Sequence, residues 1–158
     1  MNFCYWSNIF DYETINFYKN KIENYYTQIL ESNVDSMDFD YRTLDITNDK
    51  IVYLVKNFIE NKLSIKLDIV QAQCQVWPIN SESKLHRHCD DPNEVRKITK
   101  YNSLIYLNDD YDGGEFYTDE IIYKPKANSL TFFDGSETYH GVKQVKTNHR
   151  YTLIFWWK

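Results

Sequence analysis

The sequence has few of the residues that bend or cross-link a chain: its 158 residues include four glycines, three prolines and three cysteines. The scarcity of glycine and proline excludes collagen-like and low-complexity classes, and a hydrophobic content of 42% excludes a disordered chain. Cys4, Cys74 and Cys89 lack the spacing of a disulfide framework or a zinc knuckle, which favours a reducing, cytoplasmic compartment. We expect a single domain over residues 1–158, as a monomer or homodimer.

Long apolar runs and an excess of positive charge are also missing. No run approaches the roughly 18 apolar residues that cross a bilayer, and the N-terminus MNFCYWSNIFDYE lacks the basic start of a signal peptide. Asp and Glu number 23 against 18 Lys and Arg, and the pI is near 5.3, which argues against nonspecific binding to nucleic acid through its phosphates. We therefore expect neither a membrane nor a nucleic-acid partner.

The hydrophobic period of the sequence changes partway along the chain. Apolar residues three and four apart predict an amphipathic helix over about residues 11–31. A second apolar stripe of the same kind predicts another helix, which would begin after a cap at Asn48 or Asp49. A helical part over about residues 1–62 would thus precede a core of strands over about residues 65–158.

The later part of the chain alternates apolar and polar residues, as strands with one buried face do. A change of phase near Val70 predicts a bulge. The predicted strands cover about residues 39–46, 65–76, 84–90, 101–108, 114–118, 120–124, 129–134, 138–145 and 149–157. Helices followed by many short strands favour an α+β, mainly β fold: a double-stranded β-helix (jelly roll, cupin-like) with two N-terminal helices bracing one sheet.

The densest group of reactive side chains is the segment LHRHCDDPN. Residues i and i+2 of a strand share a face, so His88 and Asp90 would point together, as would His86. A histidine from another strand, His140 or His149, would complete a set of two imidazoles and one carboxylate, which holds iron(II) in non-haem oxygenases. The simpler interpretation of the His-x-Asp pair is a surface salt bridge.

Further segments follow this pair in a fixed order. The ordered set is His88-Cys89-Asp90, Asp91-Pro92-Asn93, Ser103 to Asn108, Gly113-Gly114-Glu115-Phe116, Pro125, Leu130 to Phe133, His140-Gly141-Val142 and Arg150 to Trp156. Over about residues 69–158 it resembles the 2-oxoglutarate and iron(II)-dependent dioxygenases, most closely their prolyl 4-hydroxylase-like branch.

The resemblance implies a role for each of five side chains. His88, Asp90 and His140 would hold iron(II) and carry catalysis. Arg150 would pair with the distal carboxylate of 2-oxoglutarate, since a planar guanidinium can grip a carboxylate with two hydrogen bonds. Tyr106 matches a strand tyrosine whose hydroxyl contacts the same carboxylate, although it can also be read as one more core aromatic.

Three further residues are candidates for substrate contacts. Trp77 stands where relatives have a tyrosine, after a one-residue shift, and is either core or a wall of the substrate channel. His86 would bind substrate, orient a ligand or be a hydrogen-bonded histidine without a role in the site. Trp156 faces inward with Arg150, as core or as the floor of the site. The loop at 91–100 is either a solvated loop or a segment that gates the substrate.

The implied activity is hydroxylation of a C–H bond, with a prolyl residue of a peptide or protein as the leading substrate. Iron(II), 2-oxoglutarate and O2 would be required, succinate and CO2 would be released, and ascorbate would sustain turnover. The alternatives are a hydroxylase of a free amino acid or small metabolite, and a non-catalytic jelly-roll binding module. A nucleic-acid demethylase is disfavoured because no second arginine follows Arg150.

Overall fold

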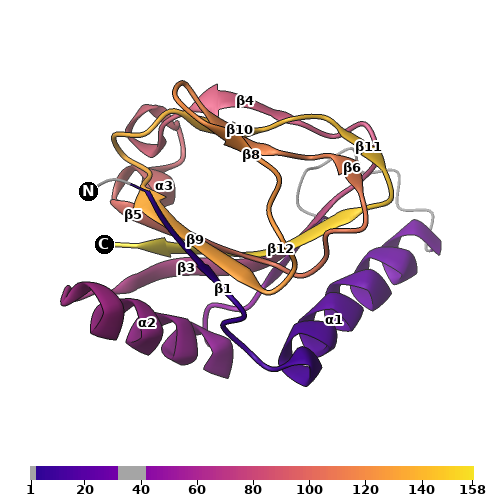
Figure 1. Ribbon diagram of the computed structural model, residues 1–158, viewed down its shortest axis with the longest axis horizontal. Coiled ribbons are helices and arrows are strands. Elements are labelled where there is room, and N and C mark those ends of the chain that lie inside the picture. Colours follow the sequence, from indigo (N-terminus) through magenta and orange to yellow (C-terminus); the bar gives the residue numbers. More distant parts are fainter. Residues whose placement is uncertain (1–2, 32–41) are drawn as a thin grey trace.

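Two facing β-sheets make up most of the protein, and two helices lie on the outer side of one sheet (Figure 1). The computed structural model describes residues 3–31 and 42–158. The arrangement confirms the mainly β, double-stranded β-helix fold with two bracing helices.

The larger sheet runs through the middle of the molecule. Within the described residues it has six strands: β1 (Cys4–Ser7), β2 (Thr43–Asp45), β3 (Ile69–Trp77), β5 (Tyr101–Tyr106), β9 (Ser129–Asp134) and β12 (Arg150–Trp157). Their spatial order is β1-β9-β5-β12-β3-β2, with every neighbouring pair antiparallel. The last strand in the chain, β12, therefore lies between β5 and β3.

The smaller sheet covers the inner face of the larger one. It contains β4 (Ser83–His86), β7 (Phe116–Thr118), β8 (Ile122–Tyr123) and β10 (His140–Val142), in the order β4-β10-β7-β8. A separate pair joins β6 (Asp112–Gly113) to β11 (Val145–Thr147). Between β4 and β5 the chain forms a 3-10 helix, η2 (His88–Asp90), and a short α-helix, α3 (Glu94–Lys97).

Both long helices bury one apolar stripe. Helix α1 (Tyr12–Glu31) buries residues spaced three or four apart: Ile15, Tyr18, Ile22 and Tyr26. Helix α2 (Lys50–Leu63) follows Asp49, as predicted, and ends at Ser64 in the left-handed conformation. The Asp49 carboxylate accepts hydrogen bonds from Tyr18 Oη at 2.5 Å and from Lys21 Nζ at 3.2 Å, so it ties the two helices together. Among the described residues, none of the three α-helices α1, α2 and α3 has the length and hydrophobicity of a membrane-spanning helix.

Strand β12 divides its side chains between two cores. Leu153, Phe155 and Trp157 belong to the large cluster that the helices complete, whereas Ile154 and Trp156 belong to the cluster between the sheets. Successive strand residues point to opposite faces, so the even-numbered side chains of β12 face the space between the sheets. Arg150, at the start of the strand, is one of them.

The predicted elements hold with a few differences. The bulge near Val70 is confirmed, because Trp156 lies opposite Gln71 while Trp157 lies opposite Ile69. Strand β1 had not been predicted. The predicted strand 39–46 is represented by β2, and residues 39–41 lie outside the described residues.

Candidate active site

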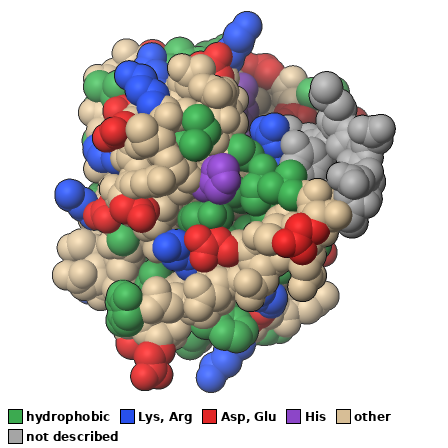
Figure 2. Space-filling model, turned by 90° about the vertical axis from the view of Figure 1, so that its right-hand side faces the viewer, with side chains coloured by type: hydrophobic (Ala, Val, Ile, Leu, Met, Phe, Trp, Pro, Cys, Tyr) green, Lys and Arg blue, Asp and Glu red, His purple; other side chains and the backbone are tan. Residues whose placement is uncertain are grey.

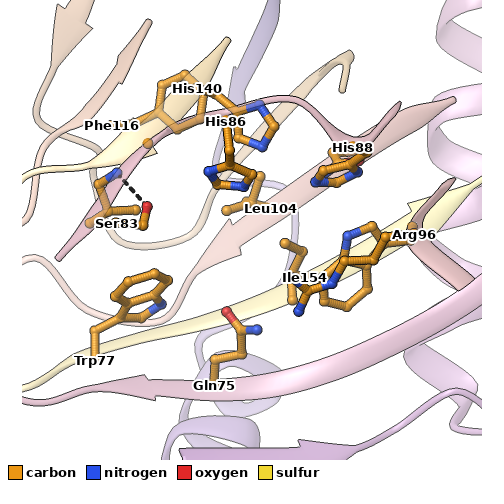
Figure 3. A pocket seen from close by; sticks show the side chains of 14 residues that line it. Gln75, Trp77, Ser83, His86, His88, Arg96, Leu104, Phe116, His140 and Ile154 are labelled. Carbon is orange, nitrogen blue, oxygen red and sulfur yellow. Dashed lines mark hydrogen bonds between the residues drawn. The ribbon is translucent and has the colours of Figure 1, made fainter. Parts of the chain in front are cut away.

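Three histidines converge in a cavity between the two sheets (Figure 3). His86, His88 and His140 each offer a ligand atom, and these atoms lie within 4.8 Å of one another. Strand β10 pairs with β4 so that His140 lies opposite His86, with ring centroids 4.5 Å apart. The ring of His88 lies 5.1 Å from that of His140. The structure therefore brings together the predicted pair His88 and His140.

Hydrogen bonds fix which nitrogen of two of these rings is free. His140 Nδ1 lies 2.8 Å from the Thr138 carbonyl oxygen, and His86 Nδ1 lies 2.9 Å from the Lys84 carbonyl oxygen. Since a carbonyl only accepts, Nδ1 carries the proton in both neutral rings and Nε2 keeps its lone pair. Metal-ligating histidines are usually held in this way.

Metal binding also requires an uncharged imidazole ring, and burial meets this condition. Burial, reinforced by the neighbouring His86, lowers the pKa of His88 to about 4 and that of His140 to about 3. Asn102 Nδ2 lies 3.2 Å from His88 Nε2 and orients this ring. Near neutral pH both imidazoles are therefore uncharged.

Asp90, predicted as the carboxylate ligand, is not part of this cluster. Its carboxylate accepts two hydrogen bonds from Arg87, at 2.9 Å from Nε and 3.3 Å from Nη2, and its side chain is 52% exposed. The hydrogen bonds from Arg87 lower the pKa of Asp90. The i, i+2 rule fails here because the chain leaves the extended conformation at His88 and enters η2. His86, predicted to bind substrate, to orient a ligand or to have no role in the site, takes the third place in the cluster.

The cavity holds about 130 Å³ and is lined mainly by apolar and aromatic side chains. Its lining residues are Gln75, Trp77, Ser83, His86, His88, Arg96, Asn102, Leu104, Phe116, His140, Gly141, Val142, Ile154 and Trp156. Trp77 and Gln75 lie across the cavity from the histidines (Figure 3). All three candidates for substrate contact, Trp77, His86 and Trp156, are therefore cavity walls.

The molecular surface carries a histidine side chain beside a group of hydrophobic side chains (Figure 2). Of the cavity histidines, His88 and His140 are buried and His86 is half-buried. At least part of the cluster can thus be reached from solvent.

Arg150 is fully buried, and no nitrogen of its guanidinium has a hydrogen-bond partner among the described residues. The guanidinium carbon lies 5.4 Å from the ring of Trp77 and 5.3 Å from the ring of Tyr106. Gly114, at φ +64°, leaves room for it, because a Cβ there would lie 3.1 Å from Arg150 Cδ. A buried unpaired cation is costly, so this position calls for an anion.

Tyr106 belongs to a triangle of hydroxyl groups that the sequence pattern does not bring together. Its Oη lies 3.1 Å from Tyr123 Oη and 3.3 Å from Thr131 Oγ1, and the latter two oxygens are 2.5 Å apart. Tyr123 comes from the two-residue strand β8, whose weak pattern gave no signal of a functional position. Together with Arg150, the triangle forms a polar, donor-rich end to the inter-sheet space.

Another residue of the site, Arg96, comes from the loop that follows the cluster. It lines the cavity, donates to Asp91 at 3.0 Å and lies 5.5 Å from the ring of Trp156. His149, the other downstream histidine, lies outside the cluster and contacts Tyr26 and Tyr151.

These features agree with a match to a known family. The family model described as the 2OG-Fe(II) oxygenase superfamily matches residues 72–158. The chain belongs to this superfamily. The matched residues begin in β3 and include the histidines, Tyr106 and Arg150, which confirms the resemblance read from the sequence.

Prolyl hydroxylases are among the proteins that this chain resembles in sequence. Prolyl 3-hydroxylase 2 of Mus musculus is 39% identical over an alignment of 64 residues, with coverage of 35% of this chain and 9% of that protein. Prolyl 3-hydroxylase 1 of Gallus gallus is 34% identical over 64 residues, again 9% of its length. The chain therefore matches only a small part of these longer proteins.

Solved structures share the fold over nearly the whole chain. A viral collagen prolyl hydroxylase from Paramecium Bursaria Chlorella virus-1 superposes with a TM-score of 0.73 at 14% identity, covering 99% of this chain and 96% of that one. A Pseudomonas putida prolyl-4-hydroxylase gives 0.73 at 14% identity, covering 99% and 92%. AviO1 from Streptomyces viridochromogenes gives 0.75 at 11% identity, covering 99% and 89%.

Proposed function

We propose that this superfamily member hydroxylates a C–H bond, using iron(II), 2-oxoglutarate and O2 and releasing succinate and CO2. The observation that carries the proposal is the pairing of two features across one inter-sheet space. Imidazoles gather at one end of this space, and a buried guanidinium without a hydrogen-bond partner among the described residues lies beside its far wall at Trp77.

The residues present fit both groups. Imidazole is a suitable ligand for iron(II), and the low pKa values of His88 and His140 keep both rings uncharged near neutral pH. The unpaired nitrogens of Arg150 fit the distal carboxylate of 2-oxoglutarate, with Tyr106 as a hydroxyl donor beside them. The bound metal would supply the activation of dioxygen, coupled to decarboxylation of 2-oxoglutarate.

The protein's own residues bind, orient and exclude water. His88 and His140 would hold the metal, while Thr138 and Asn102 keep these two rings in position. Arg150 would fix the cosubstrate by its far carboxylate, which orients the reacting end toward the histidines. The apolar cavity walls keep water away from the oxidant, which protects the enzyme from unproductive oxidation.

We propose a prolyl residue of a peptide or protein as the substrate. The similarity to prolyl hydroxylases supports this class, and so does the cavity, because walls such as Leu104 and Ile154 suit an uncharged, apolar side chain. Arg96 at the cavity would contact an acidic or carbonyl group of the flanking peptide, in keeping with a gating role for loop 91–100.

The test is an assay for succinate with iron(II), 2-oxoglutarate, ascorbate and a library of proline-containing peptides. Mass spectrometry should find a gain of one oxygen and locate it on proline. The variant His140→Ala should lose turnover, whereas His149→Ala, which removes a histidine outside the cluster, should keep it. Equal activity in wild type and His140→Ala, or none in either, would contradict the proposal. Oxidation of free amino acids alone would assign the substrate to small molecules instead.

A further inference from the structure

We infer that the metal site of this chain is a set of three imidazoles, with His86 as the third ligand and no carboxylate. The inference rests on the proposed function only in taking the histidine cluster as a metal site. It departs from the set of two histidines and one carboxylate expected from the sequence, in which Asp90 was the third ligand.

His86 and His140 have equivalent positions and hydrogen bonds. They face each other across the β4–β10 pair, and their rings are the two closest in the cluster. Each ring bonds through Nδ1 to the carbonyl oxygen of the residue two positions earlier, Lys84 for the first and Thr138 for the second. Each therefore presents an unprotonated Nε2, and the arrangement that prepares His140 as a ligand prepares His86 equally.

The backbone after His86 keeps His88 on the cavity side and turns Asp90 away from it. Arg87 is extended, at φ −120° and ψ 152°, so His86 and His88 keep the i, i+2 relation and reach the same cavity. The 3-10 turn then begins, and Asp90 leaves this face. Both of its oxygens are bound by Arg87, and neither belongs to the group of ligand atoms within 4.8 Å.

The net charge of the metal site also depends on the ligand set. A carboxylate would cancel one of the two positive charges of a bound divalent cation, whereas three neutral imidazoles cancel none. The cation would then keep its full charge in a cavity whose other lining cation is Arg96, itself paired with Asp91. Such a site should favour anionic ligands: one carboxylate of 2-oxoglutarate would cancel one charge of the cation, while the distal carboxylate would pair with Arg150.

The test measures metal binding without turnover, using cobalt(II) as the probe and its visible absorption as the readout. His86→Ala should weaken cobalt affinity by more than tenfold, at least as much as loss of a group that merely orients a ligand. Asp90→Asn should stay within threefold of wild type. His149→Ala is the matched control, since it removes an imidazole outside the cluster and should leave binding unchanged. His86→Gln, which keeps a polar side chain at the same strand end, guards against misfolding in His86→Ala and should also lose affinity.

Loss of cobalt affinity in Asp90→Asn with retention in both His86 variants would overturn the inference. Loss in Asp90→Asn together with the His86 variants would also overturn it, because a carboxylate would then belong to the set. The outcome is separable from that of the proposed function. Wild-type protein that binds cobalt with the predicted dependence on His86, yet forms no succinate with iron(II), would refute the function and leave the ligand set standing.

Discussion

Arg150 and Tyr106 form a buried pair in which the guanidinium carbon lies 5.3 Å from the centroid of the ring, and neither side chain has any exposed surface. A cation over an aromatic face gains about 0.5–2 kcal/mol. Removing an ion from water costs several kcal/mol, so the aromatic contacts alone do not offset the burial of Arg150. The buried charge of Arg150 is therefore better accommodated when an anion is bound beside it than when none is bound, and this difference can be measured.

Replacing Arg150 by Met should separate binding from stability. The variant removes the charge but keeps a long side chain, so the melting temperature should stay equal or rise, because an unpaired buried charge is gone. The apparent affinity for 2-oxoglutarate should fall by about 10- to 100-fold, as expected for losing charged hydrogen bonds worth roughly 1.5–3 kcal/mol. Arg150→Lys should have a milder effect. Titration of 2-oxoglutarate against succinate formation checks this, and an unchanged affinity would refute the role.

Tyr123 should act on the cosubstrate through Tyr106. Its hydroxyl bonds both Tyr106 and Thr131, so Tyr123→Phe should leave the Tyr106 hydroxyl less well oriented. We expect the KM for 2-oxoglutarate to rise about 2- to 10-fold, the equivalent of one neutral hydrogen bond, with kcat nearly unchanged. Tyr106→Phe should raise it more. Tyr53→Phe, on the exposed face of α2, serves as the control. A fall in kcat without a change in KM would contradict this positioning role.

Asn128 should be important for attaching the N-terminal segment. It adopts φ +58°, and its side chain bonds both backbone groups of Phe10, at 3.0 Å to the N–H and 2.6 Å to the carbonyl oxygen. Asn128→Gly loses only the bonds, whereas Asn128→Ala also places a Cβ in the left-handed region. Urea unfolding should therefore give the order wild type, Gly, Ala, with losses of roughly 1–2 and 2–4 kcal/mol. Equal stability of the Gly and Ala variants would show that a Cβ in the left-handed conformation costs nothing at this position.

Asp49 should make stability depend on pH. Burial opposes its ionisation, but hydrogen bonds from Tyr18 and Lys21 outweigh burial and lower its pKa. A carboxyl whose folded pKa is depressed contributes stability above its unfolded pKa, near 3.9, and that stability is lost as pH falls through the folded value. Asp49→Asn should thus unfold more easily than wild type at pH 7, by about 1–3 kcal/mol. Denaturant titrations should show this gap closing below about pH 4. A gap that is independent of pH would contradict the assignment.

Elements with a long, regular pattern could be predicted from the sequence. The stripe of α1 and the alternation around the Val70 bulge both follow from which side chains one face can bury. Strand β1 could not, because four residues carry too little alternation and its pairing with β9 joins segments more than 120 residues apart.

The site was predictable where it lies on regular strands. His140 and Arg150 begin strands β10 and β12 and face inward by strand geometry. Asp90 was misplaced because the predicted strand was carried through to residue 90, while the chain turns at His88. The spacing of hydrophobic residues does not reveal the local hydrogen bonds that form a short turn.

The central place of β12 links assembly of the fold to the presence of Arg150. Without this strand, the larger sheet separates into β1-β9-β5 on one side and β3-β2 on the other. During synthesis, the two halves must wait unjoined until residues 150–157 emerge, and most of their mutual contacts are distant in sequence. A chain interrupted before Arg150 would lose its middle strand and its anion-binding arginine in one event. Truncated products should therefore be eliminated as unfolded protein and should not persist as folded shells that capture metal without cosubstrate.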